Sequence, residues 1–110
     1  MTHLLVLTNL PDVASAQALA TLLVDQRLAA CVNLLAPARA IYRWQGKVET
    51  AEEVPLMIKT VATRYNAVEA AIKAHHPYEL PEIIAIPISC GLPGYLAWLE
   101  AETVLAAGPC

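Results

Sequence analysis

The sequence lacks the residues on which several large classes of function depend. It contains no phenylalanine and only four glycines, Gly46, Gly91, Gly94 and Gly108. A phosphate-binding loop needs closely spaced glycines so that backbone amides can surround the phosphate, and these glycines are too few and too scattered to build one. The signatures of P-loop nucleotidases, dinucleotide-binding folds, G-x-S-x-G hydrolases and H-E-x-x-H metalloproteases are also missing.

Charge is scarce, and positive charge is scattered. Charged residues form 15% of the chain, whereas ordinary globular domains have about 25%. The seven basic residues form no run, and the net charge is −3, so the sequence predicts binding to neither nucleic acid nor a membrane surface. A chain with so little charge is expected to turn some apolar surface toward another subunit.

Targeting and membrane segments are not recognisable either. No apolar run approaches the roughly 18 residues of a membrane span. The first basic side chain is Arg27, so the positive start of a signal peptide is missing. Cys31, Cys90 and Cys110 are odd in number and far apart, which argues against disulfides and a Cys-x-x-Cys zinc site. We therefore expect a cytoplasmic protein, with Cys31 buried in the core and Cys90 more accessible.

The hydrophobic pattern predicts one α+β domain over residues 1–110, with a frayed end at 105–110. The run Leu4–Leu7 is typical of a strand buried on both faces, Gln45-Gly46 of a hairpin turn, and Thr63 of a helix cap. The expected strands cover residues 3–8, 30–35, 40–44, 54–61 and 82–89, and the expected helices cover 14–28, the segment between Thr63 and Pro77, and 95–104.

This order, β-α-β-β-α-β with a short terminal helix, favours a ferredoxin-like sandwich. The last strand of that topology lies at an edge of the sheet. Pro87 agrees with an edge position, because proline has no backbone N–H to donate to a second neighbouring strand.

His75-His76 is the most suggestive pair of side chains. Imidazole is a common ligand for copper and zinc, and Pro77 ends the helix directly after the pair. Glu79 and Glu82 follow. Two imidazoles are fewer than the three or four ligands that fix a metal. The alternative is that His75 faces the core and His76 is a hydrogen-bonded polar group.

The remaining polar and aromatic candidates are open to simpler interpretations. The carboxylates of Glu49, Glu52 and Glu53 are expected to be solvated on a hairpin. Large aromatic side chains are typical of interfaces, although ordinary packing explains each one equally well. These aromatic residues are Tyr42, Trp44, Tyr78 and Trp98.

Four blocks in the same order resemble the CutA divalent-cation-tolerance family across about residues 4–103. They are RLAACVN at 27–33, IYRWQGK at 41–47, HHPYELPE at 75–82 and YLAWL at 95–99. The resemblance implies a ferredoxin-like fold in a homotrimer similar to PII signalling proteins. It also implies a cytoplasmic role in tolerance of copper and other divalent ions.

The resemblance also implies particular site residues. Copper would bind at His75 and His76, and some members add a cysteine at the end of the first strand, where this chain has Thr8. A threonine hydroxyl is a poor substitute for a thiolate ligand. The family further implies clefts between subunits, which in this chain would involve Trp44, Lys59, His76, Tyr78 and Glu82.

We therefore predict a homotrimeric divalent-cation tolerance protein that binds copper, or another divalent cation, weakly and is not an enzyme. One alternative is a PII-like signalling protein that binds a small ligand at subunit clefts. An enzyme such as an acylphosphatase ranks last, because the loop at residues 8–11 has no basic residue to hold an anion.

Overall fold

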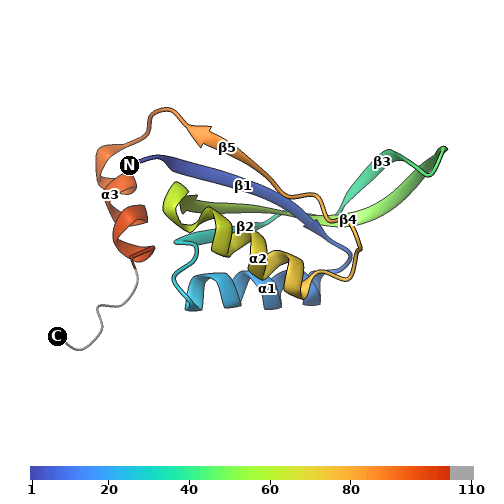
Figure 1. Ribbon diagram of the computed structural model, residues 1–110, viewed down its shortest axis with the longest axis horizontal. Coiled ribbons are helices and arrows are strands. Elements are labelled where there is room, and N and C mark those ends of the chain that lie inside the picture. Colours follow the sequence, from blue (N-terminus) through green and yellow to red (C-terminus); the bar gives the residue numbers. More distant parts are fainter. Residues whose placement is uncertain (105–110) are drawn as a thin grey trace.

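The structure is a computed structural model that describes residues 1–104 (Figure 1). Expectations for residues 105–110, including Cys110, lie outside the described residues. The predicted order of elements is confirmed except that three strands, rather than two, lie between the first two helices. The elements are β1 (His3–Leu10), α1 (Val13–Asp25), β2 (Cys31–Leu34), β3 (Ala38–Trp44), β4 (Lys47–Val61), the 3₁₀ turn η1 (Ala62–Arg64), α2 (Tyr65–His75), β5 (Ile84–Ile88) and α3 (Pro93–Glu102).

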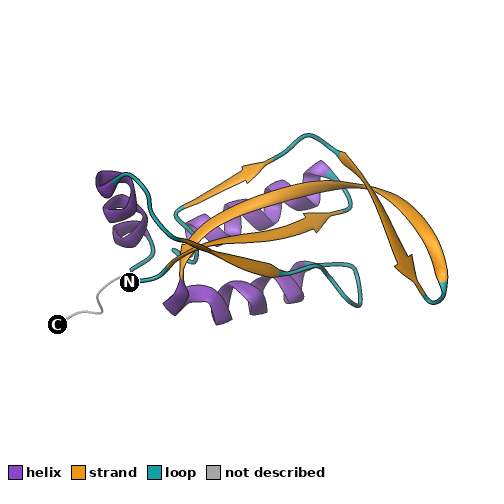
Figure 2. Cartoon of the chain, turned by 90° about the horizontal axis from the view of Figure 1, so that it is seen from above, coloured by secondary structure: helices purple, strands orange, loops and turns teal. Residues whose placement is uncertain are grey.

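The sheet has the strand order β2-β4-β1-β5, and all three neighbouring pairs are antiparallel. This is the order of a ferredoxin-like fold, so the predicted fold class is confirmed. Strand β5 lies at an edge as predicted, with Pro87 opposite Leu4 of β1. The first half of β4 pairs with β3 instead, and this hairpin extends past the end of the sheet (Figures 1 and 2).

The core lies between one face of the sheet and the helices α1 and α2, which both lie below the sheet in Figure 1. Side chains alternate along a strand, and Val6, Thr8 and Leu10 of β1 are buried. Leu5 and Leu7 are only half-buried. The prediction that β1 is buried on both faces is therefore wrong for the single chain, because the helices cover only one face.

Local signals in the sequence set several element ends. The Oδ1 atom of Asp12 accepts a hydrogen bond from the backbone N–H of Ser15 at 2.7 Å, which caps α1. The Gln45-Gly46 turn is confirmed, with positive φ angles of 49° and 79°. The prediction for Thr63 is wrong: it lies inside η1, which leads directly into α2 without a side-chain cap.

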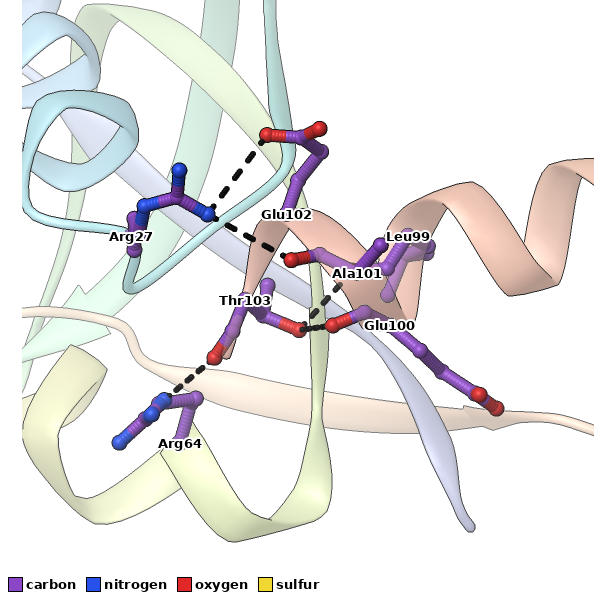
Figure 3. Close-up of polar contacts among 7 residues, drawn as sticks. All are labelled: Arg27, Arg64, Leu99, Glu100, Ala101, Glu102 and Thr103. Carbon is purple, nitrogen blue, oxygen red and sulfur yellow. Dashed lines mark hydrogen bonds and ion pairs between the residues drawn. The ribbon is translucent and has the colours of Figure 1, made fainter. Parts of the chain in front are cut away.

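Helix α3 packs over the end of the sheet, where Leu99 is fully buried. Two arginines hold its C-terminal carbonyl groups (Figure 3). Arg64 Nε donates to the carbonyl oxygen of Thr103 at 2.7 Å, and Arg27 Nη1 donates to that of Ala101 at 3.5 Å. The last carbonyls of a helix have no partner within the helix, so these side chains complete its end.

Candidate functional site

The chain has a cleft of about 700 Å³ where the end of β1, the β3–β4 hairpin and the loop after α2 meet. Pockets of about 300–1,000 Å³ are typical of small-molecule sites. Its lining combines aromatic, apolar and acidic side chains. The lining residues are Asn9, Ala40, Ile41, Tyr42, Trp44, Glu53, Tyr78, Glu79, Leu80, Pro81 and Glu82.

The structure brings three of the predicted cleft residues, Trp44, Tyr78 and Glu82, together in this cleft. His76 lies behind its wall and is only 9% exposed. Lys59 lies elsewhere: its Nζ donates to the side-chain oxygen of Asn33 at 2.6 Å. Within a single chain, therefore, the five predicted residues do not form one site. Three line the cleft, His76 lies behind its wall, and Lys59 lies on the sheet face turned away from α1 and α2.

His76 holds the cleft wall in place with both ring nitrogens. Nε2 bonds to the backbone carbonyl oxygen of Asn9 at 2.5 Å, and Nδ1 accepts the backbone N–H of Tyr78 at 3.1 Å. A ring that accepts at Nδ1 and donates at Nε2 is the neutral form with its proton on Nε2. The ring also lies 4.7 Å from that of Tyr78, measured between centroids. This geometry matches the interpretation of His76 as a hydrogen-bonded polar group.

His75 is arranged differently. It is exposed at the end of α2, so the interpretation that it faces the core is wrong. Its Nδ1 bonds to the carbonyl oxygen of Ala71 at 2.9 Å, and Nε2 has no partner among residues 1–104. When Nδ1 donates that bond, Nε2 keeps a lone pair that can bind a metal.

The fit of this region to a metal ion is therefore partial. Within residues 1–104, no three His, Cys, Asp or Glu side chains gather closely enough to hold an ion together. Thr8, at the position where the resemblance implies a cysteine in some members, is 1% exposed, and its Oγ1 has no hydrogen-bond partner within the described chain. A single chain thus offers one open imidazole, fewer than the three or four ligands of a fixed site.

The cleft is electrostatically negative. Glu53, Glu79 and Glu82 line it, and no Lys, Arg or His among the described residues does. Partial burial is the main cause that raises the pKa of Tyr78 above its ordinary value of 10.0, and the negative charge of Glu53 raises it further. Negative charge on the Tyr78 hydroxyl is therefore disfavoured in the cleft, whereas a positive charge nearby would be favoured.

Sequence reasoning missed some residues of the cleft, above all Asn9, Glu53 and Glu79. Glu53 was expected to be solvated, but it is half-buried and lines the cleft. The predicted Gln45-Gly46 turn could have indicated this position, because it sets the pairing of the hairpin. Glu53 is opposite Ala38 in that pairing and therefore lies on the same face as Ala40, Tyr42 and Trp44. Nothing in the local sequence places Asn9 beside residues 78–82.

The sheet face turned away from α1 and α2, which we call the outer face, carries many apolar side chains. Ile84 and Ile86 of β5 are 49% and 46% exposed. The alternation and the strand register place the following residues on this face: Leu5, Leu7, Met57, Ile84, Ile86 and Ile88.

Cys31 and Lys59 belong to the same outer face, on paired strands. The Cys31 sulfur lies 4.0 Å from Lys59 Nζ. The prediction that Cys31 is a buried core residue is wrong for the single chain, because it is only half-buried on the side away from the helices; Cys90 is exposed, as predicted.

Fold and site together define a small ferredoxin-like protein with a cleft beside a long hairpin. A model of the CutA1 divalent ion tolerance protein family matches residues 4–102. The chain therefore belongs to the CutA1 family, and the resemblance identified from the four sequence blocks is confirmed. Neither the family description nor the names of the relatives below state a catalysed reaction.

Relatives in sequence and structure agree with this assignment. The chain is 44% identical to the divalent-cation tolerance protein CutA of Pectobacterium atrosepticum over 88% of each chain. The Thermus thermophilus divalent cation tolerance protein has a TM-score of 0.91 at 41% identity, over 93% of this chain and 99% of that one. CutA from Xylella fastidiosa has a TM-score of 0.90 at 47% identity, with coverages of 93% and 98%.

Two observations bear on location. Among residues 1–104, none of the helices has the length and apolar character needed to cross a membrane. A third solved structure, from Archaeoglobus fulgidus, is called a periplasmic divalent cation tolerance protein; it is 34% identical with a TM-score of 0.90, over 93% of this chain and 99% of that one.

Proposed function

We propose that this protein acts in divalent-cation tolerance by binding copper(II), and other divalent cations less specifically, as a homotrimer. The observation that carries the proposal is the open Nε2 atom of His75 at the exposed end of α2. The proposal includes a cytoplasmic location, no catalytic activity, and neither nucleic acid nor membrane as a partner.

The environment of His75 favours a cation. Unpaired carbonyl groups give the C-terminal end of a helix a partial negative charge, which attracts positive charge. Neutral imidazole is also among the preferred ligands of copper(II). His76 can bind the same ion only if Nδ1 loses its hydrogen bond from the backbone N–H of Tyr78, or if Nε2 loses its hydrogen bond to the carbonyl oxygen of Asn9. We therefore propose weak binding centred on His75, with His76 as a second ligand at an added cost.

The trimer is supported by the outer face. Apolar area removed from water contributes about 25 cal/mol per Å², and Ile84, Ile86 and their neighbours leave much of this area uncovered in a single chain. Contact with a second and third copy would cover it. Light scattering at micromolar concentration is expected to give the mass of three chains; a stable monomer would remove the trimer from the proposal.

Copper titration tests the metal proposal. Calorimetry of the wild type and His75→Ala should show a loss of roughly tenfold or more in affinity, because one imidazole ligand is removed. Lys73→Ala is the matched control: it changes the same last turn of α2 but removes no ligand, so affinity should be kept. Equal affinity in wild type and His75→Ala would reject His75 as the ligand.

The cleft favours a second candidate function, that of a PII-like signalling protein that binds a small ligand. Its volume of about 700 Å³ and its mixed apolar and polar lining support this reading. A thermal-shift screen tests it, since any ligand that binds the native state raises the unfolding temperature. A ligand whose effect disappears in Trp44→Leu would assign the binding to the cleft.

A further inference from the structure

The chemistry of the cleft lining points to a class of ligand. We propose that the cleft binds a small organic cation, an alkylammonium compound whose charged group lies among carboxylates and aromatic rings and whose carbon chain lies on the apolar lining. This inference rests on the second proposed function, ligand binding at the cleft. It adds the charge and the shape of the ligand.

The charge of the ligand follows from the carboxylates. Glu53 comes from β4, whereas Glu79 and Glu82 come from the loop after α2, so two different elements bring negative charge to the cleft. No basic side chain of the described residues lines the cleft to neutralise it. Partial burial is the main cause that raises the pKa of Tyr78, and the nearby negative charge of Glu53 raises it further. An anionic ligand would be repelled at this position.

The aromatic side chains supply a second attraction for a cation. Tyr42, Trp44 and Tyr78 all line the cleft. The face of an aromatic ring carries partial negative charge, and it attracts ammonium groups within about 6 Å of the ring centre. The attraction is stronger where water is partly excluded, as it is in a concave site.

An organic cation fits the cleft better than a metal ion does. Within residues 1–104, no three carboxylate, imidazole or thiol groups gather around one point closely enough to hold an ion. A ligand with a carbon chain can instead meet the cleft carboxylates one by one. Ala40, Leu80 and Pro81 provide the apolar surface on which the carbon chain of such a ligand can lie.

The polar groups of the cleft are held in place before any ligand arrives. Asn9 Nδ2 donates to Glu82 Oε1 at 3.2 Å, which orients that carboxylate. The backbone of Asn9 is itself bonded to His76, which also bonds the backbone of Tyr78. His76 is therefore a positioning residue that ties β1 to the loop. A site organised in this way loses little conformational freedom on binding.

Binding can be measured on the full chain carrying Trp98→Phe, which leaves Trp44 as the only tryptophan. Trp98 is 43% exposed on α3, so this change should be tolerated. The probes are four molecules of similar length that differ in charge: 1,4-diaminobutane, n-butylamine, 1,4-butanediol and succinate. Trp44 fluorescence should respond to the diamine best, to the monoamine less, and to the diol and succinate roughly tenfold or more weakly.

Two adjacent carboxylates provide the matched variants. Glu53→Gln should weaken diamine binding several-fold, because Glu53 lines the cleft. Glu52→Gln should not, because Glu52 is exposed on the opposite face of the same strand. Binding should weaken as salt increases.

The outcomes separate this inference from the function on which it rests. Equal responses to the diamine and the diol, or a better response to succinate, would overturn the cationic ligand while leaving the cleft as a binding site. Equal loss in Glu52→Gln and Glu53→Gln would also overturn it, because general surface charge would then explain the binding. No response to any of the four probes would reject the inference and count against ligand binding at the cleft.

Discussion

Replacing Thr8 by valine is expected to stabilise the protein. Its side chain is 1% exposed on β1, and Oγ1 has no hydrogen-bond partner within residues 1–104. A buried polar group without a partner costs about 1–3 kcal/mol. Valine has nearly the same shape and suits a strand equally well. Thr8→Val should therefore raise the free energy of unfolding by about 1 kcal/mol.

Thr60 is the matched control, because it is also a fully buried strand threonine. Its Oγ1 donates to the carbonyl oxygen of Leu28 at 2.7 Å. Thr60→Val removes this bond and leaves the carbonyl of Leu28 with one partner fewer, so the free energy of unfolding should fall by about 1 kcal/mol. The same chemical change should thus have opposite signs at the two positions.

Urea unfolding of the two variants and the wild type measures this difference. All samples need the same protein concentration, because the stability of an oligomer depends on it. The expected signs are a higher urea midpoint for Thr8→Val and a lower one for Thr60→Val, with unchanged slopes. If Thr8→Val destabilised the protein as much as Thr60→Val does, Thr8 Oγ1 would have a partner such as a buried water, and the reasoning would be refuted.

Three further predictions concern other parts of the molecule. A hydrogen bond of 2.8 Å to Glu69 is the main cause that raises the pKa of Tyr65, so Glu69→Gln should lower this pKa in an ultraviolet titration, and an unchanged pKa would contradict the assignment. Because the pKa of Tyr65 in the folded protein lies above 10.0, the stability that this bond contributes should be lost as the pH rises above 10.0. Arg64→Ala should cost about 1 kcal/mol and speed hydrogen exchange in α3, since Thr103 loses its 2.7 Å bond; exchange rates equal to those of the wild type would oppose this role. Ile86→Glu on the outer face should give a smaller mass in light scattering, because burying an unpaired charge in an apolar interface is costly. An intact trimer would show that the interface does not include Ile86.

Much of the fold could be predicted because local signals agree with one another. Apolar alternation over 54–61 matches the buried side chains of β4, and Pro87 marks an edge strand. Gln45-Gly46 has the backbone angles that a tight hairpin needs. The burial of β1 could not be predicted correctly. An apolar run such as Leu4–Leu7 indicates apolar surroundings on both faces of a strand, but the pattern is the same whether the same chain or another chain covers the second face.

The site was less predictable because it forms between distant segments. Asn9 and Glu82 are hydrogen-bonded although 73 positions separate them. Only the folded sheet and the loop after α2 bring them together. The pair His75-His76 was recognisable from sequence, but its division of roles was not: His76 supports the cleft with both ring nitrogens, whereas His75 keeps one nitrogen open. The two side chains diverge because Pro77 disfavours helical geometry at the residue before it, so α2 ends at His75 and His76 is extended.

The central claim, that His75 is the primary copper ligand, is tested most directly by NMR of the imidazole nitrogens. The chain has only three histidines, so each ring can be followed separately. Copper(II) is paramagnetic and broadens the signals of nearby nuclei, so small additions should broaden the ring of His75 first. His76 should follow, and His3, which begins β1 and is bonded to Glu100 at 2.7 Å, should respond last. Broadening that begins at His3, or that leaves the His75 ring unchanged, would contradict the account.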